Sequence, residues 1–432
     1  MNKIRVFWFR RDLRLEDNAG LFNALAGKSS VLPIFIFDDN IIDELPEEDA
    51  RISFIYSNLK DIDEKLKTFG SGLKIYKGKP EKVWEQILED YDVEAVYANE
   101  DYEPYAIKRD AEIDNFLKSN GVSKGLQTHK DSVVFAKDEV LKDNGSPYTV
   151  FTPYKNKWLA LFQETDIRDK KLTEKDYNGF LKFKNDFPSL ESLGFRPSPI
   201  RVKPYILDGL NSYADTRDFP AIDGTSYLSP HLRFGTVSVR QIINSLDKKD
   251  ETFLSELIWR EFFMQILYHF PRVESENFKT KYNGIKWRNE EGEFQKWCYG
   301  ETGFPIVDAG MRQLNKTGYM HNRVRMITAG FLCKHLLIDW RWGEAYFAKK
   351  LLDYELSSNN GNWQWAAGTG CDAAPYFRIF NPITQLKKFD PKLEYTRKWI
   401  DNFDLGYNVP PVVEHRFARE RALEAYKRGL RG

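Results

Sequence analysis

Hydrophobic and polar positions alternate between two patterns over the first 130 residues. Short runs rich in β-branched and aromatic residues predict strands at 5–9, 30–39, 73–78 and 93–100, and helical spacing predicts helices at 50–70 and 80–91. Pro80 stands where a helix tolerates proline, and Gly70 stands where a helix commonly ends. Strands that alternate with helices build a parallel sheet covered on both faces. We therefore predict an α/β domain with a Rossmann-like parallel sheet over residues 1–130.

The turn after the first strand excludes one common ligand site. It reads "RRDLRLEDN" rather than a glycine-rich sequence. The dinucleotide-binding fingerprint needs glycines at this point, so that the backbone can approach a pyrophosphate closely. This domain is therefore not expected to hold a dinucleotide in that way.

The pattern changes twice along the rest of the chain. Residues 131–200 lose the alternation and are rich in Pro, Gly, Asn and Ser, which is typical of a long connector. From about residue 201 the spacing becomes helical throughout, with the clearest stretches at 252–270, 305–318 and 321–340. We predict an all-α domain over residues 201–432, joined to the first domain by the connector.

Composition narrows the class of protein. No run of about 18 apolar residues is present, so no membrane span is predicted. The arginine-rich start lacks the apolar core of a signal peptide, which favours a cytoplasmic protein. Cys298, Cys333 and Cys371 are too few and too scattered for a disulfide framework or a zinc site, and no metal is expected.

Charge and aromatic content distinguish the two halves. Residues 1–200 carry 30 basic and 36 acidic side chains (30 − 36 = −6), and residues 201–432 carry 34 and 28 (34 − 28 = +6). A basic second half fits a polyanionic partner, although a chance imbalance explains the same numbers equally well. Eight of the eleven tryptophans also lie at or beyond Trp259, which indicates that they serve either the function or the hydrophobic core of the second half.

Several polar residues of the second half stand out against apolar helical faces. The segment 357–382 has Trp363 and Trp365 among asparagines, glycines and alanines, which leaves room for a flat ligand. Glu256 lies three positions before Trp259 and therefore shares a helix face with it. Burying its carboxylate there costs free energy unless the group has a partner, and the alternative is that it lies in water at the rim. Asn322 and Met326 share another face, beside Arg325. Arg325 and Asp353 could simply pair to join two helices.

A further group of hydroxyls precedes the first of these helices. Thr225, Ser226 and Ser229 lie near an expected helix start, and a helix N-terminus with free N–H groups suits a phosphate. Serine and threonine at such positions are more often simple helix caps. The pattern is weak without further support.

Long motifs in the chain resemble one family. "RRDLRLEDN", "SPYTVFTPY", "RDFPAIDGTSYLSPHLRFG", "ELIWREFF", "ETGFPIVDAGMRQLNKTGYMHNRVRMI" and "NNGNWQWAAGTGCDAAPYFRIFNP" are similar to motifs of the photolyase/cryptochrome family. The similarity covers nearly the whole chain in order. It is greatest to class I cyclobutane pyrimidine dimer (CPD) DNA photolyases, which implies blue-light-driven repair of dimers in UV-damaged DNA, a lyase reaction in which excited reduced FAD donates an electron to a flipped-out dimer.

The resemblance also implies roles for particular residues. The residues implied to hold FAD are Tyr213, Thr225, Ser226, Leu228, Ser229, Glu256, Arg260, Asn322, Arg325, Asp353, Glu355 and Asn359, with Asn359 at the flavin N5 atom. Trp259, Asn322, Met326 and Trp365 would enclose the dimer, and Glu256 would bind its polar edge or the adenine between the flavin and the dimer. Trp363, Trp340 and Trp287 match the tryptophan chain that re-reduces the flavin. Base–aromatic stacking contributes roughly 1–3 kcal/mol per base, enough to offset much of the cost of extruding a damaged pair; photolyases are among the established examples of base flipping.

Some features favour one member of the family over another. Asn359 stands where plant-type cryptochromes carry aspartate, and Asn322 with Met326 replaces the histidines of (6-4) photolyases. The alternatives are a cryptochrome-type photoreceptor without repair activity and a (6-4) or single-strand-specific photolyase. Glu355, where relatives usually have aspartate, and Asn362, which replaces a glycine, depart from the pattern. Residues 101–110 lack the Asn-Glu pair of a folate antenna and are closer to a deazaflavin- or flavin-type pocket, with an empty pocket as the alternative. A monomer is expected.

Overall fold

The computed structural model describes residues 3–165, 167, 169–184 and 186–431. The chain forms two compact units. The first contains residues 1–139, 159–205 and 227–247, and the second contains residues 140–158, 206–226 and 248–432. The chain therefore passes between the units several times, and the unit boundaries do not coincide with the predicted divisions at residues 130 and 200.

A five-stranded parallel sheet forms the centre of the first unit, in the order β3-β2-β1-β4-β5. The strands are β1 (Ile4–Phe9), β2 (Val31–Asp38), β3 (Lys74–Gly78), β4 (Val93–Asn99) and β5 (Leu126–His129). The helices are α1 (Ala19–Leu25), α2 (Asp39–Ile42), α3 (Ala50–Lys67), α4 (Pro80–Asp90), α5 (Pro104–Ser119), α7 (Glu174–Asn178), α9 (Ser229–Phe234) and α10 (Val239–Asn244). The predicted α/β parallel-sheet domain is confirmed.

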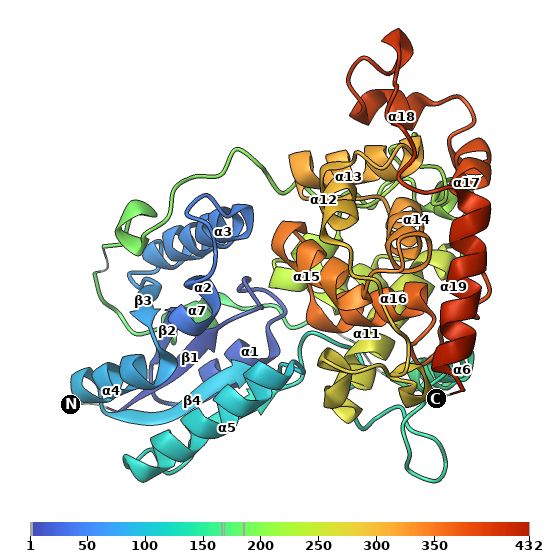
Figure 1. Cartoon of the computed structure of the whole chain (residues 1–432). Helices are drawn as coiled ribbons and strands as arrows, with labels where there is room; N and C mark the ends of the chain where they lie inside the picture. Colours follow the sequence, from blue (N-terminus) through green and yellow to red (C-terminus); the bar gives the residue numbers. More distant parts are fainter. Residues whose placement is uncertain (1–2, 166, 168, 185, 432) are drawn as a thin grey trace. The chain divides into compact units, whose positions relative to one another are not determined.

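Alternating side chains of β1 build two separate cores, one on each face of the sheet. Phe7 and Phe9 pack with α1 and α3, and Val6 and Trp8 pack with α4 and α5. Figure 1 shows the same arrangement, with α3 on one side of the sheet and α4 and α5 on the other. Both faces are covered, which explains why these strands are almost continuously apolar.

A network of buried charges joins the turn after β1 to α10. Arg240 Nε lies 3.0 Å from Asp17 Oδ2, and Arg240 Nη2 lies 2.8 Å from Asp131 Oδ1. Arg14 Nη2 lies 2.6 Å from the other oxygen of Asp131. Burial alone would raise the pKa of Asp131, but Arg14 and Arg240 together hold this pKa below its usual value. The motif "RRDLRLEDN" thus has a structural task, because it fixes the segment that contains α9 and α10.

Arg240→Met is expected to lower the free energy of unfolding by about 3–5 kcal/mol, because it leaves two carboxylates buried without this cation. A lowered folded-state pKa stabilises the fold above the unfolded pKa of about 4, and this contribution is lost as pH falls through the folded value. The variant should therefore also be less sensitive to acid between about pH 5 and pH 2. Urea unfolding of both proteins over this range measures the effect.

Arg196→Met is the matched control, since Arg196 and Glu47 form an exposed pair in the same unit, with 63% of each side chain accessible. An exposed pair of this kind contributes at most about 1 kcal/mol. Equal losses in the two variants would contradict a special role for the buried network.

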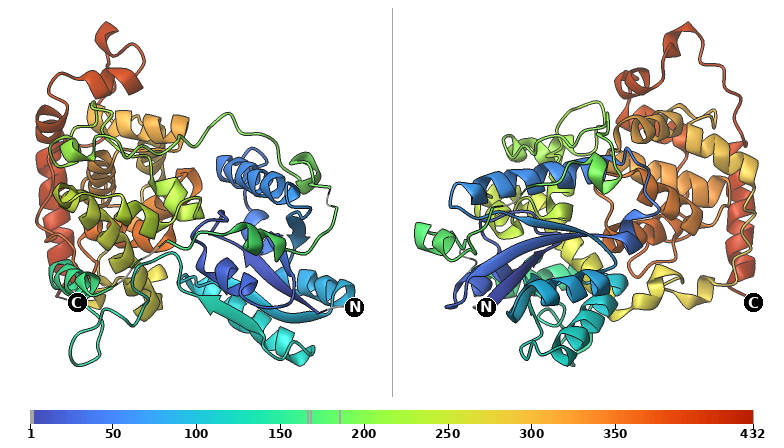
Figure 2. Two further views of the ribbon diagram at one scale, coloured as in Figure 1. Left: turned by 180° about the vertical axis from the view of Figure 1, so that it is seen from behind. Right: turned by 90° about the vertical axis from the view of Figure 1, so that its left-hand side faces the viewer.

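The second unit is predominantly helical, as predicted. Its helices are α8 (Tyr213–Thr216), α11 (Glu251–His269), α12 (Glu291–Tyr299), α13 (Pro305–Thr317), α14 (Asn322–Gly330), α15 (Trp340–Lys350), α16 (Leu356–Ala367), α17 (Pro382–Phe389), α18 (Glu394–Trp399) and α19 (His415–Gly429). Helix α6 (Phe151–Gln163) spans the boundary between the units in sequence. Figure 2 shows α19, in red, along the edge of this unit. No helix in the described part of the chain is long and apolar enough to cross a membrane.

Two parts of the predicted helical region are not regular α-helix. The stretch 321–340 is interrupted, because α14 ends in a π-helical turn, η6 (Phe331–His335), and Leu337 then has a left-handed backbone with φ 54°. The segment before α9 is mostly irregular, and α9 and α10 belong to the first unit. The prediction of helix throughout from residue 201 was therefore too broad.

Candidate functional site

Helix α16 lies against α11, α14 and α15 and carries three of the candidate residues. Its glycine is a contact point between helices. A Cβ added at Gly361 would approach the Phe263 ring to 2.2 Å, and one at Gly343 of α15 would approach the Trp363 ring to 2.1 Å. The missing side chains thus make room for aromatic rings of the protein itself. Within the stretch 357–382, Gly361 therefore serves internal packing, whereas Ala366 and Ala374 line a pocket beside Trp365.

Two ion pairs flank the start of α16. Arg325 Nη2 lies 2.9 Å from Asp353 Oδ2, and Arg325 Nε donates to the Met320 carbonyl at 2.8 Å. Arg260 and Glu355 approach to 3.8 Å. The structure therefore brings two cations and two carboxylates, all predicted site residues, to one end of this helix.

Asn359 has a partner that the sequence did not suggest. Its side-chain amide donates to Glu344 Oε1 at 2.8 Å and to the Glu344 carbonyl at 3.2 Å. Burial raises the pKa of Glu344, and the hydrogen bond from Asn359 opposes this shift. Glu344 lies one turn after Trp340, so only the packing of α15 on α16 reveals the contact.

Glu256 is also paired. Arg217 Nη1 lies 2.5 Å from Glu256 Oε1, and the two side chains are 25% and 33% accessible. The Arg217 guanidinium also lies over the Tyr213 ring, 5.4 Å from its centre. Burial, reinforced by Glu256, raises the pKa of Tyr213 to about 12. The carboxylate on the apolar face of α11 thus has the partner that its burial requires, and Arg217 is a second residue that the sequence reading missed.

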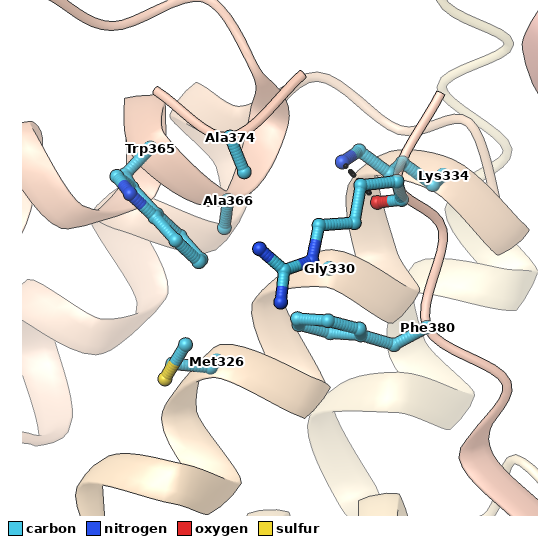
Figure 3. A pocket seen from close by; sticks show the side chains of 8 residues that line it. Met326, Gly330, Lys334, Trp365, Ala366, Ala374 and Phe380 are labelled. Atoms are coloured by element: carbon cyan, nitrogen blue, oxygen red, sulfur yellow. Dashed lines mark hydrogen bonds between the residues drawn. The ribbon is translucent and has the colours of Figure 1, made fainter. Parts of the chain in front are cut away.

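A pocket joins two of the predicted lesion residues. It is lined by Met326, Gly330, Lys334, Trp365, Ala366, Ala374, Arg378 and Phe380. Figure 3 shows Trp365 and Met326 pointing into the same hollow, with Phe380 also at its edge. Trp259 and Asn322 are not among the lining residues. Trp259 stacks on Phe151 with ring centres 3.6 Å apart, and Asn322 is exposed at the start of α14.

The three tryptophans predicted to form a chain belong to one aromatic core. Trp363 and Trp340 are buried, and Trp287 packs against the same cluster. The Trp340 ring N–H donates to Asn277 Oδ1 at 2.8 Å, and Trp287 lies 6.0 Å from the Tyr426 ring. Trp365 packs against the same cluster but is only partly buried and lines the pocket, whereas Trp363 lies inside the cluster.

The predicted phosphate-binding residues are divided between the two units. Tyr213, Thr225 and Ser226 belong to the second unit, and Leu228 and Ser229 belong to the first, where Ser229 begins α9. A backbone hydrogen bond from the Ile206 N–H to the Ser226 carbonyl, at 2.8 Å, holds the chain at Ser226. Their shared role remains a prediction.

Family models match both parts of the chain. A model of the DNA photolyase domain matches residues 5–173, and a model described as the FAD binding domain of DNA photolyase matches residues 253–405. The chain belongs to the DNA photolyase family. Full-length relatives named deoxyribodipyrimidine photo-lyase support this identification of an enzyme. One from Halobacterium salinarum is 37% identical, covering 98% of this chain and 99% of the relative, and one from Escherichia coli is 35% identical, covering 99% of both.

Solved photolyase structures share the fold. A bacterial class III photolyase from Agrobacterium tumefaciens has a TM-score of 0.87 at 31% identity and covers 100% of this chain and 98% of its own. An archaeal photolyase from Sulfolobus tokodaii, described as containing two FAD molecules, has a TM-score of 0.83 at 35% identity. The match covers 98% of this chain and 99% of the archaeal one. The assignment to class I stays a prediction.

The residues around α16 fit a flavin. Arg325 and Arg260 are donors, and Asp353, Glu355 and the side-chain oxygen of Asn359 are acceptors, which matches a ring system that carries both carbonyl oxygens and an N–H group. The Ser357 hydroxyl at the start of α16 is buried without a hydrogen-bond partner among the described residues. A bound ligand would satisfy such an atom, since an unsatisfied buried polar group costs about 1–3 kcal/mol.

Proposed function

We propose that this photolyase repairs cyclobutane pyrimidine dimers in DNA under blue light, by electron transfer from excited reduced FAD to a dimer that has been flipped out of the helix. The pocket between α14 and α16 carries this proposal, because Trp365 and Met326 both line it. An indole wall can stack on an unpaired base and contributes roughly 1–3 kcal/mol per base. Extruding a damaged pair costs a few kcal/mol, so such a wall offsets a large part of that cost.

Particular residues are proposed to hold the cofactor and the lesion. Arg325 with Asp353 and Arg260 with Glu355 would orient the isoalloxazine ring, and Asn359 would face its N5 atom. The positive guanidinium groups favour a negatively charged reduced flavin by attraction. Tyr213, Thr225, Ser226, Leu228 and Ser229 are proposed for the phosphates and the ribityl chain, and Trp363, Trp340 and Trp287 for re-reduction. Bound FAD supplies the electron when it absorbs blue light.

Glu256 is proposed to read the polar edge of the dimer or of the adenine beside it. Its present partner is Arg217, which would have to share the carboxylate or release it when substrate binds. Trp259 would have to free part of its ring for the dimer, since Phe151 stacks on it with ring centres 3.6 Å apart and Phe263 lies 5.3 Å away at 29°. Asn322 is exposed and free of such constraints. These placements support a lesion site whose polar edge is assembled on binding.

The substrate is tested with three oligonucleotides of one sequence, which carry a CPD, a (6-4) product or no lesion. The reduced protein should restore normal thymines only in the CPD strand, as followed by chromatography after illumination. Repair of the (6-4) strand alone would contradict the proposal in favour of that alternative, and binding of FAD without any repair would favour a photoreceptor. The same assay with single and double strands tests for single-strand specificity.

Asn359→Asp is expected to weaken the reduced state of the bound flavin. It would place a second carboxylate beside Glu344, whose pKa is already raised by burial, and would also repel the negative charge of the reduced cofactor. The cost should be on the order of 1–3 kcal/mol, measured as a fall in the midpoint potential of bound FAD.

Asn362→Asp is the matched control, because Asn362 is exposed on the same helix and its side-chain amide donates to the Ser358 carbonyl. It should leave the potential unchanged. An unaltered potential in Asn359→Asp as well would count against the placement of Asn359 at N5.

A second chromophore is proposed for the first unit, of deazaflavin or flavin type rather than folate. Residues 101–110 lie at the carboxyl ends of the strands, where ligands of parallel sheets commonly bind. Arg10 and Arg109 both lie over the buried Trp8 ring, at 5.2 and 4.9 Å from its centre, and both pair with Asp110, which places two largely buried guanidinium groups beside this segment. The S. tokodaii relative, described as holding two FAD molecules, supports a flavin.

A further inference from the structure

Lys334 is a buried cation without an acidic partner. It lies in the π-helical turn η6 and is only 3% accessible. Its ammonium donates to the Arg378 carbonyl at 3.0 Å. No carboxylate of the described residues forms an ion pair with it, and its hydrogen bond goes to a neutral acceptor.

A charge in this position is costly. Removing an ammonium from water costs several kcal/mol in real proteins unless an opposite charge compensates. Burial accordingly lowers the pKa of Lys334 to about 8, yet the group still keeps its proton at neutral pH. The hydrogen bond to Arg378 does not require a charge, because a neutral amine or amide would also donate. The fold alone therefore gives no reason for this cation.

The location of Lys334 suggests what the charge is for. It lines the same pocket as Trp365 and Met326 (Figure 3). Arg378, also at this pocket, is exposed and forms no ion pair with a carboxylate of the described residues. The third cation nearby, Arg323, is neutralised by Asp218 at 2.6 Å and touches Met326 through sulfur. The pocket thus carries an excess of positive charge on its Lys334 side.

We propose that Lys334 is a binding residue of the lesion pocket, whose ammonium supplies the positive charge that favours the phosphodiester between the two flipped pyrimidines. The inference rests on the proposed repair function and goes further, because it assigns an anion preference to a pocket that otherwise has aromatic and aliphatic walls. A neutral base would gain nothing from this charge. An anionic dinucleotide compensates the buried cation when it binds.

The test uses a short single strand with one thymine dimer, and a second strand in which the phosphate within the dimer is replaced by a neutral methylphosphonate. Lys334→Met keeps the length of the side chain and removes the charge. We expect this variant to bind the dimer strand about tenfold more weakly, which corresponds to ~1.4 kcal/mol. The neutral linkage should cost the wild type about as much, and it should cost the variant little more, because both changes remove the same interaction.

The pH dependence separates this charge from a purely structural role. As pH rises through about 8, Lys334 loses its proton in the folded protein, whereas a lysine in the unfolded chain keeps it up to about 10.4. The unfolded state then binds more protons, so the stability contribution of Lys334 rises with pH over this interval. Lesion affinity should fall over the same interval. Lys334→Met should show neither change and should unfold at a temperature no lower than the wild type.

The variant Lys334→Met leaves the other titratable groups near this lysine in place, so it separates their effects from that of Lys334. They are Cys333 and His335 of its own turn, Arg378, and His415 and Arg421 of α19. Burial raises the pKa of Cys333 far above this range and lowers that of His335 to about 3. A pH effect on lesion affinity that persists in Lys334→Met would assign it to another group and overturn the proposal.

Lys349→Met is the control, because Lys349 is exposed in the same unit and forms no ion pair among the described residues. It should bind the dimer strand like the wild type. Wild-type affinity in Lys334→Met, or additive losses with the neutral linkage, would contradict the inference. If Lys334→Met does not fold, the wild type still tests the proposal. Its affinities for the phosphodiester and methylphosphonate strands are compared below and above pH 8, and the difference between them should disappear at high pH. A wild type that does not distinguish dimer-containing from undamaged strands would contradict the repair function instead.

Discussion

Arg325→Met is expected to yield a protein that has lost most of its FAD. Its free energy of unfolding should also be about 3–5 kcal/mol lower, because the change leaves the carboxylate of Asp353 buried without its cation. The Asp353 side chain is only 8% accessible, and Arg325 is its ion-pair partner at 2.9 Å. The same change removes the positive charge proposed to attract the reduced flavin. FAD content per chain and urea unfolding measure the two effects separately.

Two further variants sharpen this prediction. Arg325→Lys keeps the charge but loses the Nε bond to the Met320 carbonyl, so it should be intermediate in both measurements. Arg397→Met breaks an exposed pair with Asp404 in the same unit and should change stability by at most about 1 kcal/mol, with full FAD content. Normal flavin content and stability in Arg325→Met would exclude Arg325 from the cofactor site.

Trp365→Ala is expected to weaken binding of a dimer-containing strand about 10- to 100-fold and to leave FAD binding intact. The reason is the loss of one stacking wall, worth roughly 1–3 kcal/mol per base. Trp365→Phe keeps a smaller ring and should lose less. Equilibrium binding of the dimer strand in the dark measures the affinity without repair.

Trp363 is the internal control for this experiment. It is 2% accessible and packs against Gly343, whereas Trp365 is half-buried and lines the pocket. Trp363→Phe should therefore bind the lesion normally but reduce its flavin more slowly in light with an added thiol, because phenylalanine is much harder to oxidise. Equal losses of affinity in both variants would mean that the two rings do not have separate tasks.

The sequence predicted the architecture well where periodicity was strong. The predicted strands at 5–9, 30–39, 73–78 and 93–100 match β1 to β4, and the helix starting at Pro80 matches α4. Strand β5 was missed, because "LQTH" is only four residues long and three of the four are polar. The break after α14 was also missed, since η6 keeps the apolar character of a continuing helix and only its backbone differs.

The site was predictable as a set of residue types but not as a set of partners. Arg325 with Asp353 came from the motifs and is a pair in the structure. Glu344 and Lys334 were invisible in sequence, because each gains its meaning from a contact with another element, α16 or the segment at Arg378. Trp259 shows the reverse, since a neighbouring phenylalanine takes one of its faces. Helical periodicity identifies a face, and only packing shows what covers it.

The most direct test of the whole account is repair in light compared with darkness. The purified protein, with its FAD reduced, is mixed with a strand that carries one thymine dimer, and thymine absorbance is followed. The account predicts that the absorbance returns under blue light and stays constant in the dark, and that Trp365→Ala slows the return at low strand concentration. No return in light by a protein that retains FAD, or an equal return in the dark, would contradict it.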